Sequence, residues 1–535
     1  MAIAREGDSV TEKPRRSGRR RSANMPHAIP AACGLIALWL AVLAGCTSIP
    51  QVPTEHIVMV NGRGNPVDPT GNILCADEPA PCNGSHFWLT EYHEMERSLY
   101  KTYLSSLFEA MRDAPESNGK KQLLIFIHGG MNTQVGTIER AADLHESIEA
   151  AGYFPIFVNW QSSLVSSYRD HLLYIRQGQD RGTWGMLLAP FYLLTDVTRS
   201  VARAPVVLWS LFRNNDIQTW PLVKRPSETD ETRIADDVKK EVVIDLARGD
   251  DTRDKTEKTL STLSWIFTAP TKLLIAPFLD AFGKSAWDIM LRRTDLLYHT
   301  DGEFTTESDV AMDAHKNKGG YQYVQADGGL SVFMRGLQDQ IAQNGGPDKW
   351  DITLVGHSMG TIVLNRLIRD FGTFPPGTMP FKTMPFNRIV YMAAAATVKD
   401  YEDSIFPYLA KNEHAEFYHL TLHALAEARD RLDKPIRYVD FPPRGSLLVW
   451  VDEFLANPGT LHDRTVGRFT NLTVALHDTP EELRGRIHIK EFNVGASFRD
   501  TDPQKHGDFT DPFTFWKQEC WQPKSPSSPA CFPRK

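Results

Sequence analysis

The chain has 535 residues, of which 41% are hydrophobic and 23% are charged. This is the composition of a folded globular protein, long enough for one large domain with insertions, and no internal repeat is apparent. The formal net charge of −7 becomes −11 when the seven basic and three acidic residues of positions 1–45 are left out. An acidic chain argues against nucleic acid as a partner.

The N-terminal residues have the pattern of an export signal. Five arginines between positions 15 and 21 precede the apolar stretch AACGLIALWLAVLAGC, which is short for a membrane-spanning helix. The stretch ends in Leu43-Ala44-Gly45-Cys46, which resembles a bacterial lipobox. The resemblance implies that residues 1–45 are a lipoprotein signal peptide and that Cys46 carries the lipid. The alternatives are a plain signal peptide with a chance cysteine and a chain start at Met25.

Four cysteines remain besides Cys46 and Cys33 of the leader. They form two close pairs, Cys75/Cys82 and Cys520/Cys531. An even number of cysteines in an exported chain predicts disulfides, and local pairing is the simplest of the three connectivities. No zinc-ligand spacing and no P-loop motif occurs, so we expect neither a metal nor a cofactor.

The first part of the mature chain is predicted to be a tether followed by alternating helices and strands. Residues 47–91 are rich in Pro, Gly and Asn, as in a linker. A helical pattern then covers residues 92–111, and we assign residues 46–115 to a tether with a leading helix. Buried strands are predicted at 123–127 and 153–160, separated by a helix over residues 139–151.

About 190 residues then intervene where one crossover helix would suffice. Two aromatic and leucine-rich segments, 185–212 and 259–290, are predicted to be broken into short helices by the prolines at 190, 205, 270 and 277. The charged residues between them, 213–258, are expected to form a surface excursion.

The segment DITLVGHSMGTIVLNRLIRDF, residues 351–371, contains the pentapeptide GHSMG centred on Ser358. A short β-branched run precedes the motif, and apolar residues at helical spacing follow it. Strand, tight turn and helix form the context of a nucleophile elbow, in which Gly356 and Gly360 permit the sharp turn and close packing. Further strands are predicted at 387–397, 415–424 and 486–494, which implies a parallel sheet with helices on both faces.

The strand LLIFIHGG, the elbow LVGHSMG and the later strands in this order resemble the α/β-hydrolase superfamily, in particular serine hydrolases of the lipase and esterase type. The resemblance covers residues 121–160 and 351 to about 516. It implies an α/β-hydrolase fold over residues 116–535, a mostly parallel sheet with a large helical cap-like insertion at about 165–345.

The resemblance also implies catalytic roles. Ser358 would be the nucleophile, and a histidine after the last strand its base. His506 is the one histidine beyond the strand at 486–494, whereas His488 lies within that strand. For the oxyanion hole, backbone amides of Gly130 and Met359 are implied, with Met131 as an alternative to Gly130.

The acid of the triad is left open by the sequence. Asp430 is our first choice because aspartate is the commoner acid and the preceding loop gives it reach. Glu427 comes second, and Asp400 or Asp403 after the preceding strand is a third placement. His128 is expected to shape its loop, and His357 to line the site or pack beside it.

Three functions fit this set. The first is a membrane-anchored hydrolase of carboxylic esters, with an acyl-enzyme on Ser358 and an acyl or lipid-like substrate beneath the cap. The second is an acyltransferase that uses the same site, and the third is a scaffold or binding lipoprotein without turnover. Thr47 after Cys46 favours the periplasm-facing side of the outer membrane, by resemblance to lipoprotein sorting.

Overall fold

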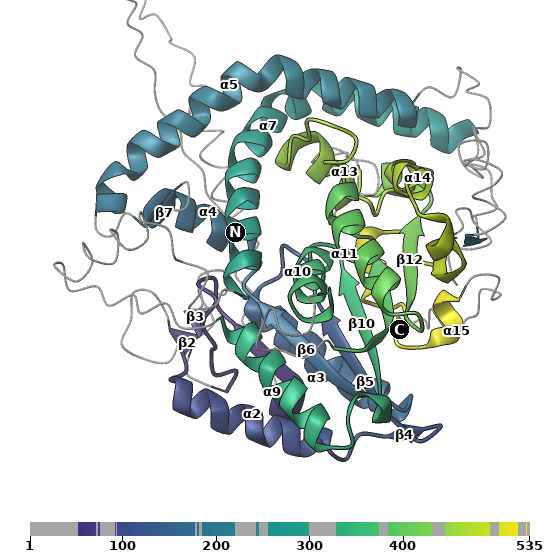
Figure 1. Cartoon of the computed structure of the whole chain (residues 1–535). Coiled ribbons are helices and arrows are strands. Elements are labelled where there is room, and N and C mark those ends of the chain that lie inside the picture. The colour runs from purple at the N-terminus through teal and green to yellow at the C-terminus, as the bar shows by residue number, and fades with distance from the viewer. Residues whose placement is uncertain are drawn as a thin grey trace, which may run out of the picture. The chain divides into compact units, whose positions relative to one another are not determined.

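The protein is built around a parallel β-sheet with helices packed against it (Figure 1). The computed structural model describes residues 52–70, 73–74, 91–92, 94–176, 179–180, 184–219, 242–245, 255–298, 328–373, 384–430, 445–492, 502–522 and 531. The proposed signal peptide, Cys46, Cys75 and Cys82 lie outside these residues. Among the described helices, none is long and apolar enough to cross a membrane.

Eight strands follow one another across the sheet in the order β1-β6-β5-β10-β11-β12-β13-β9, and all neighbouring pairs are parallel. Their bounds are β1 Ile57–Val60, β5 Lys120–Ile127, β6 Phe154–Trp160, β9 Val243–Asp245, β10 Trp350–His357, β11 Phe386–Met392, β12 Glu416–Leu422 and β13 Ile487–Phe492. The short strand β4 (Glu116–Ser117) adds an antiparallel pair to β5. Because the central strands are covered on both faces, they read as continuous apolar runs, and this is why the sequence predicts them.

The helices fill the connections between the strands. They are α2 Arg97–Met111, α3 Gln134–Ala150, α4 Leu164–Leu173, α5 Trp184–Thr219, α7 Lys255–Leu296, α9 Gly329–Gln343, α10 Gly360–Leu367, α11 Val398–Lys411, α12 Ala424–Arg429, α13 Leu447–Trp450, α14 Phe469–His477 and α15 Gln518–Trp521. Short 3₁₀ turns are η1 Thr54–His56, η3 Pro347–Lys349, η6 Glu481–Arg486 and η7 His506–Phe509, and π turns are η4 Ile368–Thr373 and η5 Val451–Leu455. Two small hairpins, β2 Ile73–Leu74 with β3 Glu91–Tyr92 and β7 Ile175–Arg176 with β8 Gln179–Asp180, complete the described elements.

The expected α/β class is confirmed, together with an inserted helical region. In that region α4, α5 and α7 pack on one another, and α7 also contacts α10 and η5. Arg293 of α7 is buried and donates to the carbonyl of Gln161 (3.0 Å) and to the carboxylate of Asp170 (2.6 Å). This arginine joins the far end of the insertion to the chain that leaves β6.

The expected breaks at the four prolines are wrong. Pro190 and Pro205 lie inside the continuous helix α5, and Pro270 and Pro277 inside α7. A proline removes one helical hydrogen bond and costs about 3 kcal/mol in a helix interior. The packing of α5, α7 and α4 against one another outweighs that local cost, and Pro190, Pro205 and Pro270 are exposed, where an unpaired carbonyl can be hydrated.

Two of the observed strands differ from the structure that the sequence predicts for their residues. Residues 57–60, expected to lie in a tether, form the buried strand β1 beside β6. Residues 243–245, expected in a surface excursion, form the edge strand β9 beside β13. At the end of the cap-like insertion, α9 packs on β1 and α2.

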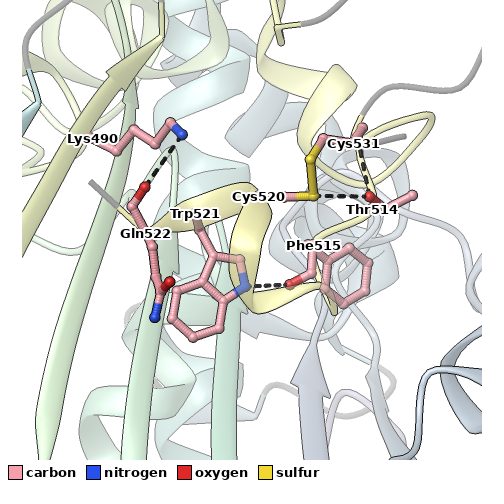
Figure 2. Close-up of a disulfide and its surroundings, with 7 residues drawn as sticks. All are labelled: Lys490, Thr514, Phe515, Cys520, Trp521, Gln522 and Cys531. Atoms are coloured by element: carbon pink, nitrogen blue, oxygen red, sulfur yellow. Dashed lines mark hydrogen bonds between the residues drawn. A yellow bond between two sulfur atoms is a disulfide. The ribbon is translucent and has the colours of Figure 1, made fainter. Parts of the chain in front are cut away.

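The predicted disulfide between Cys520 and Cys531 is present (Figure 2). The hydroxyl of Thr514 donates to the carbonyl of Cys531 (3.2 Å), and the indole N–H of Trp521 donates to the carbonyl of Phe515 (3.0 Å). Trp521 also packs edge-on against Tyr418 of β12. The disulfide thus closes a short loop after His506, and Trp521 at the start of that loop holds it against the sheet.

Candidate active site

The candidate site lies at the carboxyl ends of β5 and β10, where the chain changes direction across the sheet. From β5 the chain moves to β6 on one side, and it later returns to β10 on the other side of β5. In open α/β sheets ligands bind at such a switch point, outside the carboxyl ends of the strands. Gly129 and Gly130 follow β5, and Ser358 follows β10, so both sequence motifs meet at this edge.

Ser358 occupies a strained turn between β10 and α10. Its φ is +53°, a left-handed conformation that costs an L-residue roughly 1–2 kcal/mol. The turn is held from the next strand, because the Ser358 amide donates to the carbonyl of Met392 (2.9 Å) and its carbonyl accepts from the amide of Ala395 (3.0 Å). The hydroxyl oxygen of Ser358 is buried and has no hydrogen-bond partner in the described structure. The surrounding chain thus holds Ser358 in a strained conformation, while the Ser358 hydroxyl makes no hydrogen bond in the described structure.

Gly360 explains how the helix can start so close to the sheet. A Cβ at this position would lie 2.2 Å from the carbonyl oxygen of Ile127, a contact that no side chain tolerates. At Gly356 a Cβ would be 3.2 Å from the Cα of Thr361, which is tight but less severe. The close approach of α10 to the end of β5 therefore depends mainly on Gly360.

The loop after β5 rests directly on the elbow. A Cβ added at Gly129 would lie 2.8 Å from the Cβ of Ser358, and one added at Gly130 would lie 3.1 Å from the sulfur of Met359. Among the described residues, neither the Gly130 amide nor the Met359 amide has a hydrogen-bond acceptor. The amide of Met131, the alternative donor, donates a hydrogen bond to the carbonyl of Ser162 (2.8 Å). Two neighbouring amides are thus available beside Ser358, and the third is occupied.

Asn132 and Ser162 shape this loop, although no sequence pattern indicates a role for either residue. The side-chain amide of Asn132 donates to the carbonyls of Gly129 (2.9 Å) and Gly130 (3.0 Å). The hydroxyl of Ser162 donates to the carbonyl of Gly129 (3.1 Å). These bonds turn the carbonyls of the loop toward Asn132 and Ser162. Both residues stand in loops with no motif of their own, so only the folded arrangement reveals them.

His128 belongs to the same loop and has a structural role, as expected. Its Nε2 accepts from the amide of Trp160 (3.1 Å), so its Nδ1 carries the proton and donates to the carbonyl of Gly129 (2.7 Å). Burial lowers the pKa of His128 to about 3, which keeps the ring neutral. With both ring nitrogens bound to backbone groups, this histidine has no free position for proton transfer.

His506 lies beside the elbow, at the start of η7 after β13. Its ring is 5.0 Å from that of His357, centroid to centroid, and the Nε2 of His357 donates to the carbonyl of His506 (3.1 Å). Both ring nitrogens of His506 are buried without a partner in the described structure. Burial lowers the pKa of His506 to about 4, so the imidazole is neutral at pH 7. A neutral imidazole is the form that can accept a proton.

Asp430 is the acidic candidate that the structure brings to His506. Its carboxylate accepts a hydrogen bond from the backbone amide of His506 (2.8 Å), and Asp430 is itself buried. The contact is to the main chain of His506 and not to its ring. Asp430 therefore holds the main chain of the residue that carries the imidazole.

The other acids are placed differently. Glu427 accepts from the hydroxyl of Ser446, and burial raises the pKa of Glu427 to about 8, so it is protonated at pH 7. Asp400 binds Asn365 and Arg369 from the start of α11, and Asp403 is exposed on the same helix. In the part of the chain that the structure describes, none of these three bonds His506, whereas Asp430 does.

The remaining histidines and the possible metal ligands have simpler explanations. His488 stacks on Tyr418 near the sheet edge, with ring centroids 4.5 Å apart. Within the described part of the chain one acidic group, Glu402, His462 and Asp478, has ligand atoms close enough to hold a metal. His462 is already paired with Asp478 (3.0 Å), which raises the pKa of His462, and this ion pair accounts for the cluster.

A cavity of about 350 Å³ adjoins the elbow on the side of the insertion. Trp287 and Leu291 of α7 line it together with Ile362 of α10 and Ala395, whose amide binds the carbonyl of Ser358. Ser358 and His506 are not among the lining residues, and both are less than a tenth exposed. In this conformation both side chains are therefore shielded from solvent.

Comparison with known proteins adds no family to this geometry. No protein-family model matches the chain, and no curated protein and no solved structure shows significant similarity to it. What the fold and the site establish is an α/β protein with a mostly parallel sheet, in which Ser358, His506, Asp430 and two available amides gather at one edge.

Proposed function

We propose that the protein is a serine hydrolase that cleaves carboxylic esters through an acyl-enzyme on Ser358. The observation that carries the proposal is the strained turn at Ser358, whose buried hydroxyl has no partner and whose neighbour His357 packs against the ring of the buried, neutral His506. A protein keeps a residue in a sparsely populated conformation only where its surroundings enforce it, and such residues cluster at active sites. A structural serine would be expected to bond its hydroxyl once buried.

The chemistry follows from the residues at this edge. In the proposed reaction His506 accepts the hydroxyl proton of Ser358 while the oxygen attacks the ester carbonyl carbon. The amides of Gly130 and Met359 stabilise the negative charge that develops on the carbonyl oxygen. His506 then returns the proton to the leaving alcohol, which leaves the acyl group on Ser358. Water, activated by the same histidine, releases the acid and restores the serine.

Asp430 would complete the set as the acid. Its hydrogen bond holds the main chain of His506, and in the proposed working state its carboxylate would turn to accept from the ring N–H. Catalytic hydrogen bonds are often long or misaligned before substrate binds, so the present main-chain contact is compatible with this role. The resemblance to the α/β-hydrolase superfamily supports the same assignment, since the acid precedes the histidine in that order.

The buried site and the inserted helices favour an acyl or lipid-like substrate. The insertion packs on α10 through α7, directly behind the elbow, and the adjoining cavity is lined mainly by apolar side chains. We include in the proposal that the protein is held at the bacterial envelope by lipid on Cys46. The support for the anchor comes from the LAGC pattern alone.

Hydrolysis of p-nitrophenyl esters tests the proposal, with acyl groups that range from acetate to palmitate. We expect turnover by the wild-type protein and its loss in Ser358→Ala, with circular dichroism showing that the variant is folded. Ser446→Ala is a matched control, because Ser446 is equally buried but bonds Glu427. Equal ester hydrolysis by folded Ser358→Ala and wild-type protein would refute the assignment.

A further inference from the structure

Helix α5 exposes an apolar surface that its fold does not cover. Large apolar side chains are exposed along most of its length, and Figure 1 shows the helix on the outer side of α7. Between positions 184 and 209 they are Trp184, Met186, Leu187, Phe191, Leu193, Leu194, Val201, Val206 and Trp209. Single exposed apolar residues are normal on proteins, but a contiguous row of this kind marks a surface that meets something apolar.

Between positions 184 and 209, no charged side chain is fully exposed on this surface. The remaining exposed residues from 184 to 209 are Pro190, Thr195, Thr198, Ala202 and Pro205. Both threonine hydroxyls donate to carbonyls one turn earlier, those of Phe191 and Leu194 (2.8 Å each), so neither needs water. A helix that faces water usually carries charged residues on its outer side.

The three charged residues of the same stretch are Asp196, which is buried, and Arg199 and Arg203, which are half-buried, and the charge of Arg199 acts on the buried Asp280 of α7. Asp196 is buried and binds His171 and the hydroxyl of Tyr168 on α4 (3.1 Å each). Arg203 forms an ion pair with the buried Asp280 of α7 (3.0 Å) and donates to Asn457 (2.9 Å). These contacts fix the rotation of α5 about its axis. The apolar side of the helix therefore faces outward.

From these observations we propose that the outward face of α5 binds the surface of a phospholipid bilayer. At 3.6 residues per turn, the exposed uncharged positions cover more than half of the helix circumference. A partner helix contacts a narrower stripe, whereas a helix that lies in the surface layer of a membrane is in contact with lipid over a broad arc. Trp184 and Trp209 stand near opposite ends of the face, and tryptophan is enriched where membrane meets water.

The position of the predicted anchor agrees with this occupant. Ile57, the first residue of β1, stands eleven positions after Cys46, a distance of at most about 40 Å for extended chain. Lipid on Cys46 would keep the folded chain close to the bilayer, and stable attachment of a lipidated protein generally needs a second contact. The face of α5 would supply that contact. Because the face is uncharged, its binding should not depend on salt.

Binding of α5 to a bilayer would be independent of the reaction at Ser358. Trp184 and Trp209 are 69% and 67% exposed and serve as intrinsic probes. The test compares full-length protein on vesicles of phosphatidylethanolamine and phosphatidylglycerol with the variant Trp184→Phe/Trp209→Phe. The difference in tryptophan emission between the two proteins isolates these two residues, and bromine on the acyl chains quenches only tryptophan that reaches the lipid.

We expect this difference emission to be quenched by brominated lipid and protected from iodide in the water, equally at low and high salt. The double variant Phe191→Glu/Leu194→Glu should lose most of the quenching by brominated lipid and regain quenching by iodide. Leu461→Glu is the matched control, since Leu461 is 59% exposed but lies outside the insertion, and it should leave the quenching unchanged.

Three results would overturn the proposal. Strong quenching by iodide on vesicles would show that the face remains in water. Protection from both quenchers would show that protein covers it, either a second copy or another part of this chain. Failure of the full-length protein to bind the vesicles at all would exclude a bilayer as its occupant. Ester hydrolysis measured on the same samples reports separately on Ser358.

Discussion

The edge of the sheet around Ser358 and the outward face of α5 depart from the usual pattern of burial in opposite directions. At the sheet edge, polar atoms of Ser358 and His506 are buried without hydrogen bonds in the described structure. On α5, apolar side chains face outward. Buried polar groups without partners and exposed apolar groups both cost free energy. The first cost is explained by a reaction that needs those atoms, and the second by a surface that meets lipid.

The two regions also differ in how tightly neighbouring residues constrain them. Around Ser358 the backbone is bonded to Met392 and Ala395, and glycines at 129 and 360 stand where a Cβ would collide. On the outward face of α5, by contrast, the side chains contact little. Substitutions in the first region should therefore have large effects on function or folding, and substitutions in the second should be tolerated by the fold.

The largest expected effect is the loss of turnover in Ser358→Ala and His506→Ala. Each should reduce kcat/KM by about 10⁴- to 10⁶-fold, because nucleophile and base act as one unit. For the same reason the double variant should be little worse than either single variant. Steady-state kinetics on a dissolved ester checks this, and additive losses would mean that the two residues act separately.

Asp430 is expected to matter less than the serine and the histidine. Asp430→Asn keeps an oxygen that can accept the bond from the His506 amide but removes the charge, and we expect a loss of about 10²- to 10⁴-fold in kcat. Glu427→Gln is the control and should lose less than tenfold, because Glu427 is already protonated at pH 7. A loss below tenfold in Asp430→Asn would reduce Asp430 to an anchor of the main chain.

The pH dependence of the rate gives a second view of the buried histidine. Burial lowers the pKa of His506 to about 4, and the base must be unprotonated, so activity should persist as the pH falls from 7 to 5. Below about pH 4, kcat/KM should fall roughly tenfold per unit of pH. A profile whose midpoint lies near 6.5 would show that His506 is solvated in the working enzyme. Fluorescence measured at each pH separates this effect from unfolding.

The disulfide has an intermediate expected effect, on stability alone. Cys520→Ser/Cys531→Ser should lower the free energy of unfolding by about 2–4 kcal/mol, because the disulfide closes a short loop and so restricts the unfolded chain. Denaturant titration of the oxidised protein and the variant measures the difference. Equal midpoints would show that packing around Trp521 holds this segment without the covalent bond.

The smallest effect is expected on the outward face of α5. Leu194→Ala should change the free energy of unfolding by less than about 0.5 kcal/mol in the absence of lipid, because Leu194 is exposed. Val207→Ala on the inner side of the same helix is the matched control and should cost about 1–3 kcal/mol. A large loss in Leu194→Ala would mean that protein covers this face, and the contrast between the two regions would fail.

Much of the sheet could be predicted from the sequence because its central strands are long apolar runs. The strands predicted at 123–127, at 153–160 and immediately before GHSMG are confirmed as β5, β6 and β10, with β6 beginning at Phe154. The strands β1 and β9 were not predictable in this way. Each has four residues or fewer and lies in a segment whose composition is typical of linkers or charged loops, so their pairing is decided by neighbours distant in sequence.

The candidate site likewise has parts that the sequence predicts and parts that it does not. The positions of Ser358, Gly130 and His506 follow from local motifs and from the order of the strands, and the structure brings them to one edge. The bond between Asp430 and the His506 amide joins residues 76 positions apart, and no local pattern indicates it. Nor could local propensity reveal that α5 continues through Pro190 and Pro205, since tertiary packing compensates for both.

Labelling with a fluorophosphonate probe tests the central claim most directly, because the probe reacts only with an activated serine. Peptide mapping after reaction of the folded wild-type protein should locate the adduct on Ser358 alone. His506→Ala, whose serine is intact but has no base, should label far more slowly. Absence of an adduct on Ser358 in folded protein, or equal labelling of wild-type protein and His506→Ala, would contradict the account.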